Sequence, residues 1–450
     1  MQRPVCALVV SVLLALVAPQ AFGWGNHSLA AYRAFEKMPE VASAGSIAAE
    51  PLESFLRSEE KTLEALLASQ EAWAQANLEK FPVRPTALAF KADPSRSDEA
   101  RRLAFLMALR IAPNSRFALY YQPDPQLSLP ASANLLPHAS VNTLPEAGNA
   151  SQRYLALKPG EPIAPLSVLA SACDEPDYGL DINLWEDSPS DWGKVYGFGT
   201  QPFGNPALSF SSQAPFHMGF MHESRIVYLA APFIKRTFPL LRVHQYTSLA
   251  ELAFRTGHPY WGWRFAGLSL HYLQDLTQPY HASLAPGEST LKLLGVNALA
   301  MAGMPSKKED MVILLSNRHL ALEKYQTELL HHAAQRKQET SIEVALHAID
   351  RDRAYPEWND RYLRDAVAAQ AAQAGSRLVE ILLSTLPGNY VNDPGFDFGV
   401  KEGEISLVAE LAKRDAADRA KLDAIIAELM GNFAAHSRNA MRGILKAGGL

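Results

Sequence analysis

The sequence predicts an all-α fold, with a single multi-helix domain over residues 24–450 and a loop-rich insertion at about 112–216. Two patterns indicate this class. Long stretches combine good helix formers with apolar residues at helical spacing. Runs that alternate apolar and polar residues, as half-buried strands do, are few and short. A length of 450 residues is sufficient for one large domain.

The first 23 residues are typical of a secretory signal peptide. Arg3 precedes an apolar run at residues 5–18, and the small residues Ala21 and Gly23 occupy the −3 and −1 positions of a cleavage site. The run of 14 residues is too short for a bilayer span, which needs about 20. We therefore expect a secreted or periplasmic mature protein that begins at Trp24.

Seven later stretches carry helical periodicity, and the middle of the chain does not. The segment at about 112–216 is rich in Pro, Gly, Ser and Asn, which predicts long loops, and such loops are often functional. The predicted helical stretches are 59–80, 97–111, 245–256, 262–277, 309–336, 358–385 and 403–435.

The composition excludes several classes of protein. With 48% hydrophobic and 20% charged residues, the chain is too apolar to be intrinsically disordered. A net charge of −5 argues against a broad basic surface for nucleic acid. The two cysteines, Cys6 and Cys173, are too few for a disulfide scaffold.

The densest group of metal-ligand residues follows a predicted helix. His271 and Asp275 are four residues apart, so both project from one face. Pro279 ends the helix and His281 follows the break. Two imidazoles and a carboxylate near one point suit zinc. A histidine and an aspartate one helical turn apart, taken alone, more often form a hydrogen bond or an exposed pair.

Two further features raise the expectation of a metal site. His319 and Glu323 repeat the four-residue spacing on another predicted helix. Alone they indicate a solvated face, but two such pairs fit a metal site between helices. A mature terminus at Trp24 offers an α-amino group and a carbonyl oxygen close to His27; the alternative is a frayed terminus with a buried tryptophan.

The segment HYLQDLTQPYHA, the His319–Glu323 pair and Trp24-Gly25 after a cleavage site together resemble the zinc-dependent phospholipases C of bacteria and the related zinc-dependent single-strand nucleases. This resemblance implies an all-α domain around a trinuclear zinc site. It also implies two more ligands. Asp177, in a Pro-Asp-Tyr context, is preferred to Asp174 and Asp181, and His217 is preferred to His222; the alternatives stay open because the spacings are longer than is usual in the family.

Carried onto this sequence, the resemblance implies about three zinc ions per chain. Asp275 bridges two of the sites, and Asp177 is also the catalytic residue that orients or deprotonates water. The first site takes Asp177, His217, His271 and Asp275; the second takes His281, His319 and Glu323, with one open position; the third takes Trp24, His27 and Asp275.

The resemblance implies a zinc-dependent phosphodiester hydrolase that acts by metal-activated water. Glu323 and the Pro-Asp-Tyr and Pro-Tyr-His contexts favour a phospholipase C. A single-strand nuclease or nucleotidase and a non-catalytic zinc-binding descendant are the alternatives. We expect a phospholipid or other phosphodiester as substrate, transient membrane-surface contact and no stable nucleic-acid partner. Five aromatic residues could stack a base, cage a choline or pack in the core: Tyr178, Trp185, Phe216, Trp261 and Trp263.

Overall fold

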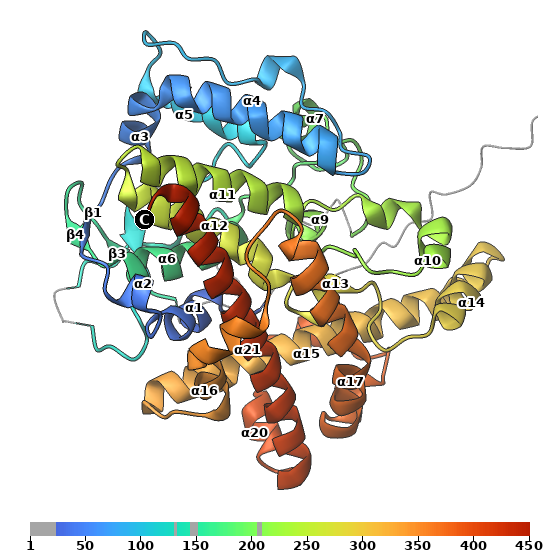
Figure 1. Cartoon of the computed structure of the whole chain (residues 1–450). Coiled ribbons are helices and arrows are strands. Elements are labelled where there is room, and N and C mark those ends of the chain that lie inside the picture. The colour runs from blue at the N-terminus through green and yellow to red at the C-terminus, as the bar shows by residue number, and fades with distance from the viewer. Residues whose placement is uncertain (1–23, 130–132, 145–151, 205–208) are drawn as a thin grey trace, which may run out of the picture.

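The computed structural model describes residues 24–129, 133–144, 152–204 and 209–450, so the proposed signal peptide at 1–23 lies outside the described residues. Helices make up 63% of the structure and strands 2%, which confirms the all-α class (Figure 1). None of the helices in the described ranges has both the length and the hydropathy of a membrane span.

The regular elements are mainly α-helices, which are between four and 33 residues long. The helices are α1 (His27–Phe35), α2 (Pro39–Ala42), α3 (Leu52–Ser58), α4 (Glu60–Asn77), α5 (Asp98–Leu109), α6 (Pro165–Asp174), α7 (Asp191–Tyr196), α8 (Ser209–Ser212), α9 (Ala214–His217), α10 (Arg225–Ala230), α11 (Pro239–Arg255), α12 (Pro259–Asp275), α13 (Pro279–Ala282), α14 (Thr290–Met301), α15 (Ser306–Arg336), α16 (Ser341–His347), α17 (Ala369–Thr385), α18 (Gly388–Val391), α19 (Phe398–Lys401), α20 (Leu407–Leu411) and α21 (Ala416–Gly448).

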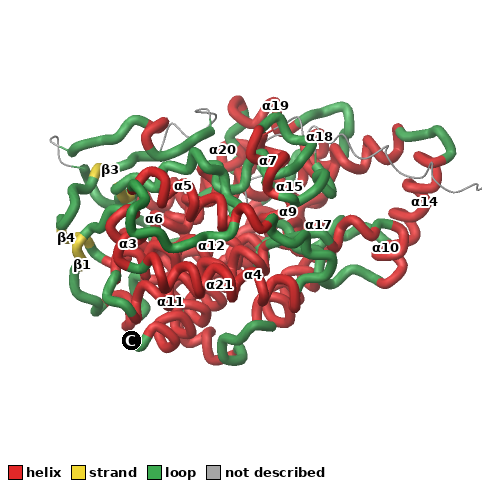
Figure 2. The backbone as a smooth tube through the Cα atoms, turned by 90° about the horizontal axis from the view of Figure 1, so that it is seen from above, coloured by secondary structure: helices red, strands yellow, loops and turns green. Residues whose placement is uncertain are grey.

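Four two-residue strands complete the described structure. They are β1 (Ile47–Ala48), β2 (Tyr120–Tyr121), β3 (Leu155–Ala156) and β4 (Pro162–Ile163). β1 pairs with β4 and β2 with β3, both antiparallel. The labelled strands lie at one edge of the molecule (Figure 2), where β1 contacts α12.

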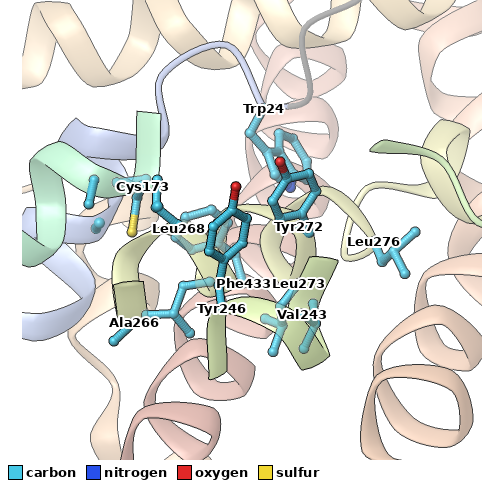
Figure 3. Packing of buried hydrophobic residues seen from close by; sticks show 14 of the residues in the cluster. Trp24, Cys173, Val243, Tyr246, Ala266, Leu268, Tyr272, Leu273, Leu276 and Phe433 are labelled. Carbon is cyan, nitrogen blue, oxygen red and sulfur yellow. The ribbon is translucent and has the colours of Figure 1, made fainter. Parts of the chain in front are cut away.

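Helix α12 is the centre of the core. All its residues after Pro259 are buried, and it packs against α11, α6 and α21. Residues from distant parts of the chain meet there, including Trp24, Tyr272 and Phe433 (Figure 3). Gly267 allows α12 to pack closely against α6, since a Cβ at this position would lie 2.5 Å from the Cβ of Ala172 on α6. The core therefore holds α12, which carries two of the expected ligands, in a fixed position.

The structure corrects three expectations about secondary structure. The middle segment is not only loops, because α6 begins at a helix-compatible Pro165 and packs on α12 and α1. The stretch 403–435 is not one helix, because Asp415 caps the start of α21 and α20 is separate. The stretch 358–385 starts later, with a π-helical turn at Leu363–Ala368 that leads into α17.

Candidate metal centre

Six elements of the fold bring eight of the expected ligands together. Helix α1 supplies His27, and the 3₁₀ turn Glu175–Tyr178 supplies Asp177. Helix α9 ends at His217, and α12 carries His271 and Asp275. Proline starts α13 four residues beyond the end of α12, which turns the chain back and places His281 beside the pair. The remaining two ligands, His319 and Glu323, lie on α15.

Eight of the nine expected residues form three buried groups whose ligand atoms lie within 4.8 Å of one another. Each group combines imidazole and carboxylate donors, so each could hold a metal ion. The groups are His27, His271 and Asp275; Asp177, His217 and His271; and His281, His319 and Glu323.

Asp275 joins the first two groups through its two oxygens. Oδ1 lies 3.3 Å from His27 Nε2, and Oδ2 lies 3.3 Å from His271 Nε2 and 2.9 Å from His217 Nδ1. Asp177 Oδ1 completes the arrangement at 3.6 Å from His271 Nε2. One carboxylate thus faces two sets of imidazoles, as a bridging ligand must.

The third group lies beside the first two. His319 Nε2 is 2.5 Å from Glu323 Oε1, and His281 Nε2 is 3.8 Å from the same oxygen. The other nitrogen of His281, Nδ1, lies 3.9 Å from Asp275 Oδ1. The three groups therefore form one continuous cluster.

Hydrogen bonds orient the imidazoles so that one nitrogen of each faces the cluster. His27 Nδ1 pairs with Gln274 Oε1 at 2.9 Å, and His271 Nδ1 pairs with the Cys173 carbonyl oxygen at 2.7 Å. His281 Nδ1 pairs with the His217 carbonyl oxygen at 2.9 Å. Because these acceptors require a proton on Nδ1, the Nε2 lone pairs are free to bind a metal.

Several atoms that face the cluster have no hydrogen bond, and this observation tests whether a metal fits. Buried polar groups are nearly always hydrogen-bonded, and an unpaired one is costly. Here, five such atoms belong to expected ligands, and cations placed among them would satisfy all five. They are His27 Nε2, Asp177 Oδ1, Asp275 Oδ1, His281 Nε2 and His319 Nε2.

The protonation states in the metal-free cluster follow from burial and from charge. Burial lowers the pKa of His281 and of His319 to about 3, so both imidazoles are neutral, as metal ligands must be. Burial raises the pKa of Asp177 to about 7. Burial opposes ionisation of Asp275, but His271 and the other imidazoles outweigh it and hold the pKa well below its ordinary value. Asp275 is thus the permanent negative charge of the cluster.

Asp181 has a different role from the one the sequence left open for it. Its Oδ2 lies 3.4 Å from His217 Nε2, on the side of the ring opposite the cluster. Arg242 contacts Asp181 Oδ1 at 2.7 Å, and the Tyr272 hydroxyl donates to Oδ2 at 2.6 Å. Asp181 therefore contacts the His217 nitrogen that points away from the cluster, and this contact helps to orient the ring.

The other two alternatives lie outside the cluster. Asp174 accepts hydrogen bonds from the Ser28 amide and from Gln122. His222 is exposed and bonds to the Arg364 carbonyl. Asp174 and His222 therefore form structural hydrogen bonds outside the cluster.

Trp24 is fully buried, and its indole nitrogen donates to Thr277 Oγ1 at 2.8 Å. Gly25 lies so close to α15 that a Cβ would be 2.1 Å from Thr327 Oγ1. The backbone at Trp24-Gly25 is therefore held between α15 and the turn that joins α12 to α13.

Two glutamines of the central segment have roles that were not anticipated. Gln274 orients His27, and Gln278 Nε2 donates to Glu323 Oε1 at 3.0 Å. Their only sequence signal is their position within HYLQDLTQPYHA.

The aromatic residues near the cluster are packing residues. All five named from the sequence are buried, so the expectation of core packing is the one that holds. Trp185 and Phe216 pack on each other with ring centroids 5.4 Å apart. The exposed fractions are 4% for Tyr178, 0% for Trp185, 0% for Phe216, 0% for Trp261 and 4% for Trp263.

Comparison with known proteins adds no assignment, because no family model, curated protein or solved structure matches the chain.

Proposed function

We propose that this chain is a secreted zinc-dependent phosphodiester hydrolase of the phospholipase C type, with a phospholipid as its substrate. The observation that carries the proposal is the single cluster in which Asp275 joins three groups of buried imidazoles and carboxylates. A purely structural metal site needs one closed set of four ligands. Three adjoining groups supply more donors than that.

The donor set supports zinc as the metal. Neutral imidazoles and carboxylates, with no thiolate, are typical of zinc sites that bind substrate. Cys173 contributes its carbonyl oxygen to His271 and not its thiol to the cluster. The group of His281, His319 and Glu323 offers three protein donors, one fewer than a closed site.

When bound, zinc supplies the Lewis acidity that activates water and offsets the negative charge of a phosphoryl group. Asp177 is the residue we expect to handle the proton. Its Oδ1 faces the cluster without a hydrogen-bond partner, so it can accept a proton from an attacking water. That oxygen lies 3.8 Å from His217 Nδ1 and 3.6 Å from His271 Nε2, so it is close to two of the expected metal ligands.

One observation favours a lipid over a nucleic acid. The net charge of −5 gives no broad attraction for a polyanion. The five aromatic residues do not discriminate between the two substrates, because they are buried and so can neither stack bases nor cage a choline.

The test is zinc analysis of the chain beginning at Trp24, with parallel assays of diacylglycerol release from phosphatidylcholine and nucleotide release from single-stranded DNA. We expect about three zinc ions per chain and faster lipid hydrolysis. His319→Ala should lose about one zinc ion and most of the activity. His332→Ala is the matched control, since it removes a histidine from the same helix outside the three groups.

Each contrary outcome identifies a different failure. A single metal ion unaffected by His319→Ala would exclude the cluster. A preference for single-stranded DNA would make the chain a nuclease. Intact zinc with no hydrolysis of either substrate would make it a non-catalytic zinc protein.

A further inference from the structure

Helix α14 and the start of α15 extend outward from the body of the molecule (Figure 1). None of the 12 residues of α14 is buried, although its sequence TLKLLGVNALAM is mainly aliphatic. Leu291 is 81% exposed and Met301 is 74% exposed, and Met304 in the following turn is 51% exposed. Soluble proteins rarely expose so many neighbouring aliphatic side chains unless something binds them.

Helix α10 enlarges this surface. It contacts α14, and its Ile226 and Leu229 are 55% and 75% exposed. Val227 of α10 and Leu293 of α14 pack in the same small hydrophobic cluster. Figure 2 also shows α10 and α14 at the same end of the molecule. We call residues 224–236 and 289–308 together the apolar projection.

The apolar projection is richer in cations than the chain as a whole. Its two segments contain six cations and no acid, with four acids directly beside them at Glu223, Glu288, Glu309 and Asp310, whereas the whole chain carries −5. Three of the cations pair with acids outside the segments, at Glu79, Glu288 and Asp310. Exposed aliphatic side chains interspersed with Lys and Arg are complementary to an anionic lipid surface. The six cations are Arg225, Lys235, Arg236, Lys292, Lys307 and Lys308.

The apolar projection is joined directly to the metal centre. Its first segment starts seven residues after His217, and its second starts eight residues after His281. Its end at Lys308 lies on the same helix as His319, eleven residues away, or about 17 Å along the helix axis. Three ligand-bearing elements therefore connect the cluster to one apolar surface.

We propose that the apolar projection docks on anionic phospholipid bilayers, with its leucine and methionine side chains inserted among the lipids and its cations at the headgroups. This role rests on the proposed lipid substrate, but docking itself can be measured without hydrolysis. A bilayer bound there presents its headgroups next to the helix that carries His319 and Glu323.

The experiment is flotation of the full mature chain with vesicles of phosphatidylcholine containing phosphatidylglycerol, compared with vesicles of phosphatidylcholine alone. We expect binding mainly to the anionic vesicles. Each substitution in the pair Leu291→Asn and Met301→Asn should weaken binding about tenfold, because each removes one inserted apolar side chain. The pair Arg225→Glu and Lys308→Glu changes cations that have no acidic partner among the described residues, and it should abolish the preference for anionic lipid.

Matched controls lie on α4 and α5, outside the apolar projection. Leu103→Asn changes an exposed leucine on α5, and Lys61→Glu makes the same charge reversal on α4. Both controls should bind vesicles like the unmodified chain. Circular dichroism of every variant checks that it is folded.

The outcomes separate docking from catalysis. Failure of the chain to float with anionic vesicles, while it hydrolyses a monomeric short-chain phosphatidylcholine, would overturn docking and leave the proposed function standing. Vesicle binding that depends on the apolar projection, without hydrolysis of any lipid, would support docking and count against the proposed function. Conversion of a dimer to a monomer by Leu291→Asn, with vesicle binding unchanged, would make the surface a protein interface and overturn the proposal.

Discussion

Asp275 contacts different imidazoles with its two oxygens, from α1 on one side and from α9 and α12 on the other. Asp275→Asn preserves its shape but removes the charge that these imidazoles surround. We expect the zinc content to fall from about three to about one, because Asp275 contacts the imidazoles of two groups, whereas the group of His281, His319 and Glu323 has three donors of its own. Zinc analysis of the purified variant measures this. Retention of all the zinc would show that Asp275 does not bridge.

Asp181 gives a second prediction at the scale of single residues. It faces His217 Nε2 from behind and is held by Arg242 and Tyr272. Asp181→Asn should lower zinc affinity about 10–100-fold, because partners behind a ligand set its orientation and basicity. The cobalt-substituted protein should show an altered visible spectrum, which a change in stability alone would not cause.

The control for Asp181→Asn is another buried carboxylate held by a buried arginine. Asp352 is paired with Arg438 at 2.7 Å, and within the described residues neither side chain has a hydrogen bond or ion pair with an expected metal ligand. Asp352→Asn should lower the free energy of unfolding and leave zinc affinity unchanged. Equal loss of zinc in both variants would mean that Asp181 acts only through stability.

Spacing alone predicted some of these residues and not others. His271 and Asp275 share one helical turn, and so do His319 and Glu323, so local periodicity is enough to place each pair on one face. The choice between Asp177 and Asp181 is not local. Arg242, on α11, draws Asp181 behind His217 and leaves Asp177 facing the cluster, and a contact between residues 61 apart has no sequence signal.

At the scale of elements, the approach of α6 to α12 is critical because α6 ends at the residues that orient the ligands. The Cys173 carbonyl at that end accepts from His271, while Gly267 allows the two helices to meet. A Cβ at Gly267 would lie 2.6 Å from the Leu169 carbonyl oxygen, which is backbone and cannot rotate away.

Gly267→Ala should therefore destabilise the protein by about 1–3 kcal/mol, although alanine is the better helix former. Urea denaturation of the variant measures the loss. Gly295→Ala is the matched control, because it lies inside α14 with nothing within 4 Å of the new Cβ. That variant should gain about 0.5–1 kcal/mol. Similar effects of both substitutions would show that α6 and α12 can move apart freely.

The sequence predicted the helices that have a clear apolar periodicity along their own residues. The cores of α12 and α15 follow from apolar periodicity. Helix α6 was hidden in a segment rich in Pro and Gly, although Pro165 sits at the one helical position where proline is favoured. Helix α14 was missed because it is apolar almost all round and so has no amphipathic period.

At the scale of the whole molecule, composition and periodicity predicted the all-α class. They could not predict that ligand residues from distant segments meet in one cluster. The cluster draws His27 from the first described helix and Glu323 from a helix near position 320, with α12 between them. Only the packing of α12 against α6, α11 and α21 brings these segments together. A single sequence carries little information on such long-range contacts.

We expect the α-amino group of Trp24 to link the metal content of the cluster to cleavage of the signal peptide. Trp24 is anchored by Thr277, and Gly25 is pressed against α15, so the backbone at this point is held next to the ligand-bearing elements. An α-amine has a pKa of about 7.7–8.0, so zinc can displace its proton near neutral pH, whereas an amide nitrogen is a poor ligand.

We therefore expect a chain that begins at Trp24 to bind about three zinc ions, and a chain with one extra glycine before Trp24 to bind about two. The extended chain should be less active but equally folded, because the tryptophan side chain keeps its contact with Thr277. Trp24→Phe separates the two roles of this residue, since it retains the α-amine and loses the indole hydrogen bond; its zinc content should match that of the unmodified chain. Zinc analysis, activity and circular dichroism of the three matched chains measure the effect. If the extended chain binds as much zinc as the chain that begins at Trp24, the α-amine is not a ligand and Trp24 serves only to anchor the first helix.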